Sequence, residues 1–222
     1  MQKNTPQDIL ELAYTQYTEG KYSQSLKNYE WFFDNAVQID TAYIGAKYRS
    51  LKEWYSLTKE YKPAYTALIN KKNTLLKSFN KSKNEFLLID YAKICHVLND
   101  DEEFIELFKK LEKQYPEITK DIYISIENIL IKNEEWKICN DYIKDSMKKY
   151  ETLLNKFDEL IRISESAFNG EYNQNYQKVF EADIQNLFKI LSVGNRQKEI
   201  DAIISKLKND LTSRGGSIDY TI

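Results

Sequence analysis

The residue types that most often carry out catalysis are scarce in this sequence. His96 is the only histidine, and Cys95 and Cys139 are the only cysteines. On a helix the adjacent Cys95 and His96 point about 100° apart, so they do not readily form a nucleophile–base pair. We expect both cysteines to be buried core residues. The chain contains no glycine-rich phosphate-binding motif and no serine-hydrolase motif. The sequence therefore predicts no catalytic residues, no metal ligands and no cofactor.

Paired carboxylates occur at two places, Asp100-Asp101 and Glu134-Glu135. Acid–base catalysis is one use for such pairs. Both pairs lie at the starts of predicted helices, where negative charge complements the helix dipole. Asp100 with Glu103 also fits a capping box. We therefore interpret these acids as helix-starting residues.

Composition restricts the class of protein. The 222 residues have a mass of 26.3 kDa and carry 32 basic and 34 acidic side chains, a net charge of −2. A nucleic-acid-binding protein usually has a basic excess. No apolar run reaches the roughly 20 residues of a membrane helix, and the N-terminus lacks an apolar signal core. The sequence predicts a soluble cytoplasmic protein that binds neither membrane nor nucleic acid.

The elements that position these residues are predicted to be helices. Glycine and proline are scarce, at six and three residues, and apolar residues recur every three or four positions, as in Leu26, Tyr29, Phe33 and Val37. We expect helix pairs at 6–19 with 22–37, 41–59 with 62–79, 84–98 with 101–114, 119–132 with 134–149, and 152–168 with 173–192, followed by a capping helix at 196–211. Residues 212–222 are predicted to be a mobile tail, with a possible strand at 217–222.

Internal repetition is the strongest signal in the sequence. The segment that begins Gly20-Lys21-Tyr22 and the one that begins Gly170-Glu171-Tyr172 both read Gly-charged-Tyr-polar-Gln-polar-apolar. Weaker copies place Tyr61, Asp101 and Trp136 at the Tyr22 position, so the period is 35 to 40 residues. A period of this length with two helices per unit is typical of a helical-repeat solenoid.

These units resemble the tetratricopeptide repeat (TPR) family. The first unit matches its pattern at Leu12, Ala13, Gly20, Tyr22, Leu26 and Tyr29, and the third at Ala92, Asn99, Ile105, Phe108, Leu111 and Pro116. The segments 29–36 and 54–64 also resemble a group of small bacterial helical-repeat proteins without assigned activity. The resemblance implies an all-α fold, a right-handed α-solenoid of about five hairpins with a capping helix, in a single domain over 1–211. Lys52, Glu127 and Ile163 occupy the small-residue position of the first helix in units two, four and five, and we expect them to disturb regular stacking.

The resemblance also implies a binding face. In this family the inner face is lined by fixed positions of the first helix of each unit. Carried across, these are Tyr14 and Tyr17, Arg49 and Glu53, Lys93 and His96, Asn128 and Lys132, and Ser164 and Phe168. The cations would meet carboxylates of an extended peptide, and Asn128 would bond its backbone. The predicted function is non-catalytic protein or peptide binding, as an interaction adaptor.

Other interpretations stay open at this point. The chain could be a bacterial immunity protein that neutralises a toxin, an enzyme with a pocket around His96 and Lys93, or a homodimer. Trp31 is a second candidate contact for a partner, although packing against the next hairpin is the favoured use for it. The lysines between Lys71 and Lys83 would allow nucleic-acid binding but lack interleaved aromatic residues.

Overall fold

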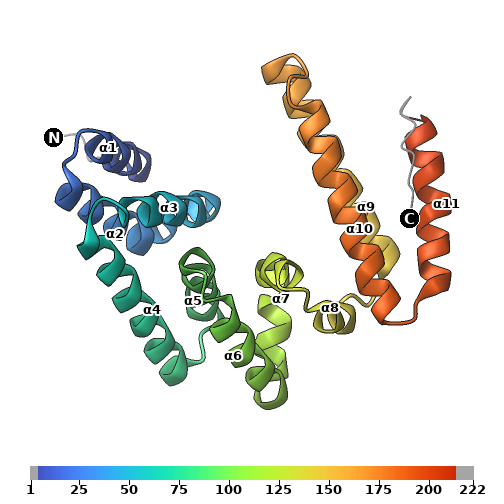
Figure 1. Ribbon diagram of the computed structural model, residues 1–222, viewed down its shortest axis with the longest axis horizontal. Helices are drawn as coiled ribbons and strands as arrows, with labels where there is room; N and C mark the ends of the chain where they lie inside the picture. Colours follow the sequence, from blue (N-terminus) through green and yellow to red (C-terminus); the bar gives the residue numbers. More distant parts are fainter. Residues whose placement is uncertain (1–4, 214–222) are drawn as a thin grey trace. The chain divides into compact units, whose positions relative to one another are not determined.

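The computed structural model describes residues 5–213, which form eleven α-helices and one short 3-10 helix without a β-strand (Figure 1). This confirms the all-α prediction. The elements are α1 (Pro6–Thr18), α2 (Tyr22–Ile39), η1 (Thr41–Tyr43), α3 (Ile44–Leu57), α4 (Lys62–Ser82), α5 (Glu85–Leu98), α6 (Asp101–Gln114), α7 (Pro116–Lys132), α8 (Trp136–Tyr142), α9 (Ser146–Phe168), α10 (Asn173–Val193) and α11 (Gln197–Ser213).

The helices group into two compact units. Unit 1 comprises the described residues up to Ile129, and unit 2 those from Leu130 onward, so that the boundary falls inside α7. The single domain expected over 1–211 stays a prediction. Thr212 and Ser213, expected in a tail, belong to α11. The rest of that tail and the possible strand lie outside the described residues.

Unit 1 is built from antiparallel neighbours that share one core. Helix α1 packs on α2, α2 on α3, α4 on α5 and α5 on α6, and contacts also join α1 to α3 and α3 to α5. The largest side chains of this core are fully buried aromatic residues, namely Tyr29, Phe32, Phe33, Trp54, Phe79, Tyr91, Phe104 and Phe108. Trp54 also donates its indole N–H to the Ala64 carbonyl, as expected for a structural tryptophan.

The two glycines of the internal repeat share a positive φ, although the residue before each differs in conformation. Gly20 follows α1 with φ +75°, and Gly170 follows α9 with φ +77°. An L-residue with a side chain is strained there, so glycine ends both helices without cost. In the first hairpin α1 and α2 lie close together. The Ser25 hydroxyl of α2 donates to the Ala13 carbonyl of α1 at 2.8 Å, and both residues are fully buried.

Helix ends test the capping predictions. Thr5 and Asp8 form a capping box at the start of α1. The capping box expected at Asp100 is wrong, because Asp100 and Glu103 both accept hydrogen bonds from Lys72 at 2.7 Å. Pro116 is the first residue of α7, which therefore begins three residues before the predicted start at 119.

The second helix of the fourth predicted pair is also wrong, whereas the first corresponds to α7. Instead of one helix over 134–149, α8 stops at Tyr142 and α9 begins at Ser146. Asp145 caps α9 by accepting from the backbone N–H of Lys148. Unit 2 then packs α9 on α10, α8 on α10, and α11 on both α9 and α10. Hydrogen bonds from Ser146 to Glu199 and from Tyr150 to Asp210 attach α9 to α11.

Crowding by three bulky residues at the small-residue position does not occur. Lys52 and Ile163 are exposed and Glu127 is half-buried, whereas the neighbouring Leu51 and Ser164 are fully buried. The predicted register is therefore wrong by one residue in both units, because the buried residue precedes the predicted position at Leu51 and follows it at Ser164.

Candidate functional site

The predicted inner face is best examined in unit 1, where α3, α5 and the first part of α7 lie next to one another. Contacts join α3 to α5, and Lys93 of α5 reaches Ser125 and Asn128 of α7. Lys132 and Ser164 belong to unit 2, so the candidate face comprises residues of unit 1 alone.

Lys93 is the central side chain of this face. It is half-buried. Its Nζ donates to the Ser125 carbonyl at 2.5 Å, lies 3.4 Å from Oδ1 of Asn128, and stands 5.7 Å from the centre of the Tyr48 ring. We call Lys93 with these three neighbours the Lys93 site. Each neighbour offers only a dipole or a ring face to the ammonium group.

No carboxylate among residues 5–213 forms an ion pair with Lys93. Burial lowers the pKa of Lys93, because the charged form loses hydration. A half-buried cation without a counter-ion is costly unless an anion is supplied from outside. The Lys93 site therefore favours an anionic ligand.

The nearest acid on the same helix face is already neutralised. Asp90 lies one turn before Lys93 on α5 and is buried. Its Oδ2 accepts from Lys47 Nζ at 2.7 Å, and its Oδ1 accepts from the Tyr48 hydroxyl at 3.1 Å. Lys47 also stands 4.3 Å from the Phe33 ring centre. This packing fixes Tyr48 beside Lys93 and leaves Asp90 committed to Lys47.

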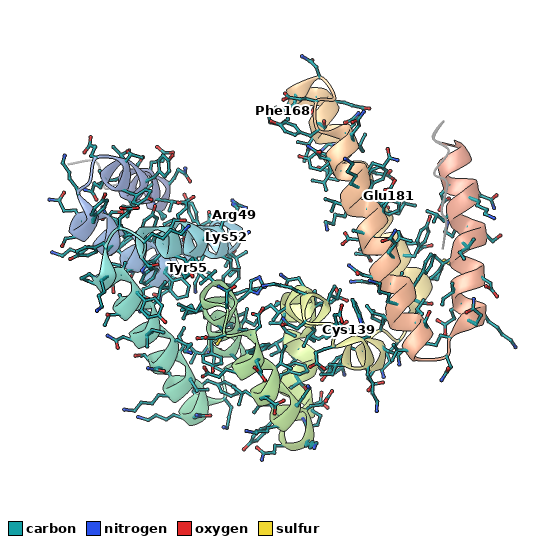
Figure 2. All side chains as sticks on the ribbon, viewed as in Figure 1. Arg49, Lys52, Tyr55, Cys139, Phe168 and Glu181 are labelled. Carbon is teal, nitrogen blue, oxygen red and sulfur yellow. The ribbon has the colours of Figure 1, made fainter. Side chains whose placement is uncertain are left out.

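Further cations lie on α3. Arg49 and Lys52 are exposed and three residues apart, so they share a helix face. Figure 2 shows both side chains close together on α3, with Tyr55 further along the same helix. Neither cation forms an ion pair within the described part of the chain. Exposed cations of this kind attract an acidic partner over a longer range.

The tyrosines predicted at the start of the face lie near Tyr29, which contacts Glu53. Tyr14 is 56% exposed and Tyr17 is half-buried. The hydroxyl of the buried Tyr29 donates to Glu53 at 3.4 Å. Burial is the main cause that raises the pKa of Tyr29, and the negative charge of Glu53 raises it further. Glu53 thus belongs to a tyrosine cluster and does not pair with Lys93.

Two other predicted residues are engaged elsewhere. His96 is half-buried, and its Nδ1 lies 2.9 Å from Oδ1 of Asp101 on α6. It therefore faces a different helix from Lys93, and the two do not share a contact. Ser164 is fully buried and accepts from the Tyr172 backbone N–H, so its place on an accessible face is wrong. Phe168 is 45% exposed and packs edge-on against Tyr172.

The remaining candidate surfaces are less organised. Trp31 is half-buried on α2. The predicted basic patch is divided, because Lys71 pairs with Asp34, Lys72 is buried against Asp100 and Glu103, and Lys83 lies over aromatic rings. Sequence reasoning missed these pairings because the partners are 28 to 37 residues away.

The cysteines are buried, as predicted. Burial raises the pKa of Cys95 to about 12, so its thiol is almost entirely protonated near neutral pH. No group of histidine, cysteine and acidic side chains within residues 5–213 is arranged to hold a metal ion. No helix in the same range is both long and apolar enough to cross a membrane.

Comparison with protein-family models, curated proteins and solved structures found no match. The resemblance to the TPR family stays a prediction, and the geometry of the Lys93 site has to carry the functional argument.

Proposed function

We propose that this protein is a non-catalytic, TPR-like helical-repeat module that binds an acidic segment of a partner protein through the Lys93 site. In this proposal the hairpins stack as a right-handed solenoid, and the first helices of successive hairpins present the binding face. The contacts of α3 with α1 and α5 support such stacking in unit 1.

The single observation that carries the proposal is the half-buried ammonium of Lys93 without a carboxylate partner. A carboxylate placed against it would be attracted more strongly than at a fully hydrated lysine, because the local dielectric constant is lower. Asn128 offers both a donor and an acceptor to a peptide backbone. Arg49 and Lys52 would increase the association rate more than the final affinity.

The direct test is binding of a fluorescein-labelled peptide containing four glutamates, followed by anisotropy. We expect Lys93→Met to weaken binding roughly tenfold, since a charge-assisted contact contributes about 1.5–3 kcal/mol, and Lys93→Arg to restore part of it. Lys77→Met is the matched control, because Lys77 is an exposed lysine on α4 away from the site.

Two outcomes would overturn the proposal. The first is equal affinity of the wild type and Lys93→Met with both proteins folded by circular dichroism. The second is a pKa of Lys93, followed by NMR, that does not rise when the peptide is added. A bound carboxylate must stabilise the charged form of the amine and so raise its pKa.

A further inference from the structure

A groove lies between α2 and α4 in unit 1, separate from the Lys93 site. Two contacts border it: the rings of Tyr22, the first residue of α2, and Tyr61, the residue before α4, lie 6.3 Å apart, and Lys71 of α4 forms an ion pair with Asp34 of α2 at 2.6 Å. Beside these contacts lies the α2–α4 groove, which is open to solvent, has a volume of about 650 Å³ and is lined by Glu30 of α2 and by residues of α4. Ligand sites commonly have volumes of roughly 300–1,000 Å³.

Glu30 is the acid that lines this groove. Its side chain is half-buried and accepts no hydrogen bond from residues 5–213. Lys71 also lines the groove, but its Nζ already donates to both carboxylate oxygens of Asp34, at 2.6 and 2.8 Å. Burial raises the pKa of Glu30, and the charge of Lys71 offsets this only in part. Glu30 is thus a carboxylate that lacks a donor.

The neighbouring groups complete a set of acceptors. Thr66 and Asn70 line the groove one helical turn apart, and neither side chain makes a hydrogen bond within the described residues. An ammonium group has three N–H donors, which matches a carboxylate, an amide oxygen and a hydroxyl. Pro63 and Ala67 provide apolar surface in the same groove, against which methylene groups can pack.

We propose that the α2–α4 groove binds an alkylammonium group, with Glu30 as its counter-ion. This chemistry is shared by a lysine side chain of a partner protein and by a free aliphatic diamine. The site is independent of the proposed function and takes the opposite charge from the Lys93 site.

The charge of Lys62 should affect binding of a lysine side chain and of a free diamine in opposite directions. It lines the groove at the start of α4, eight residues before Asn70, which is about 12 Å along a helix. Its ammonium can donate to a backbone carbonyl of a peptide but repels the second amine of a diamine. Loss of the Lys62 charge should therefore weaken binding of a lysine peptide and strengthen binding of a diamine.

The experiment is a titration of the ¹⁵N-labelled full chain with 1,5-diaminopentane and, separately, with N-acetyl-lysine methylamide, followed by amide chemical shifts. We expect saturable shifts at Thr66, Ala67 and Asn70 with at least one amine. Glu30→Gln should weaken binding at least fivefold, because loss of a partly buried ion pair exceeds the roughly 1 kcal/mol of an exposed pair. Glu102→Gln, which changes an exposed glutamate of α6, is the matched control and should have no effect.

The pH dependence follows from Glu30. Binding requires its charged form, so affinity should fall as pH decreases through the pKa of Glu30, which burial raises from the usual value. The other charged groups that face Glu30 are Lys62 and Lys71, which line the groove, and Asp34, which pairs with Lys71. The affinity of Glu30→Gln should be independent of pH there.

Several results would overturn the proposal. They are equal shifts with the neutral 1,5-pentanediol, an unchanged amine affinity in Glu30→Gln, or no saturation with either amine. Tighter binding of the lysine derivative than of the diamine by the wild type, with the order reversed in Lys62→Met, assigns the source to a lysine side chain. Tighter binding of the diamine by the wild type assigns it to a free diamine. Lys93→Met should leave amine binding unchanged, so that failure here and failure of the proposed function can be distinguished.

Discussion

Three lysines of unit 1 that are buried or half-buried, Lys47, Lys72 and Lys93, differ in whether a carboxylate binds them. Lys47 is buried on Asp90, and Lys72 is buried on Asp100 and Glu103. Burial lowers the pKa of Lys72, but its two hydrogen bonds outweigh this and raise it. For Lys93, which lacks a carboxylate, burial lowers the pKa. The presence of a bound carboxylate therefore marks Lys47 and Lys72 as structural, whereas Lys93 can bind a ligand.

The pair of Lys47 and Asp90 gives a prediction at this scale. Lys47→Met should destabilise the protein by about 3–5 kcal/mol, because it leaves the buried Asp90 carboxylate without its cation. The double variant Lys47→Met with Asp90→Leu should recover much of this loss, because no isolated charge is then buried. Urea unfolding of both variants measures the difference.

The recovery depends on desolvation being the main cost. Burial raises the pKa of Asp90 even though Lys47 and Tyr48 bind it, which agrees with a large desolvation cost. If the double variant is no more stable than Lys47→Met, the buried charge is not the main cost. Imperfect packing of the new side chains and loss of the hydrogen bond from Tyr48 to Asp90 would then matter more.

At the scale of elements, the sequence predicted most helices within a few residues because their apolar residues recur with the helical period. It failed between α8 and α9, where the chain leaves the helix at Ile143 without a glycine or proline. Ile143 is buried, and its carbonyl accepts from Arg196 at 2.6 Å. The tertiary contact with Arg196 is 53 residues away in sequence, so no local pattern reveals it.

A local signal for the start of α9 was nevertheless present. Asp145 is a good N-cap residue, and it accepts from the Lys148 N–H at 2.9 Å. Asp145→Ala should therefore cost about 1 kcal/mol of stability, whereas Asp145→Asn should cost much less. Thermal unfolding of the two variants tests this. Equal loss in both would mean that the charge of Asp145 matters and its capping geometry does not.

The candidate site was predictable only in part. Sequence reasoning selected Lys93 and Asn128, which the structure brings together, because both lie at positions that the repeat pattern directs to one face. It did not identify Tyr48, which stands beside Lys93, because that residue precedes the carried-over position Arg49 by one. Glu30 was missed because the groove depends on the spacing of α2 and α4, which no sequence pattern encodes.

At the scale of the whole molecule, both proposed sites lie in unit 1. The residues of the Lys93 site and of the α2–α4 groove all precede Ile129. Unit 1 also has its own aromatic core, which includes Phe33, Trp54 and Phe104. A unit of this length buries enough surface to fold without a disulfide or a metal.

We therefore expect a fragment ending at Asn133, after the last residue of α7, to fold on its own. It should show helical circular dichroism and a cooperative thermal transition, because its buried core is retained. A matched fragment ending at Tyr115 removes α7 and with it the Ser125 carbonyl that binds Lys93. In that shorter fragment Lys93 becomes hydrated, so its pKa should rise toward the ordinary value of lysine. If the fragment ending at Asn133 is unfolded at 25 °C, unit 1 depends on residues beyond α7, and the binding face cannot be assigned to unit 1 alone.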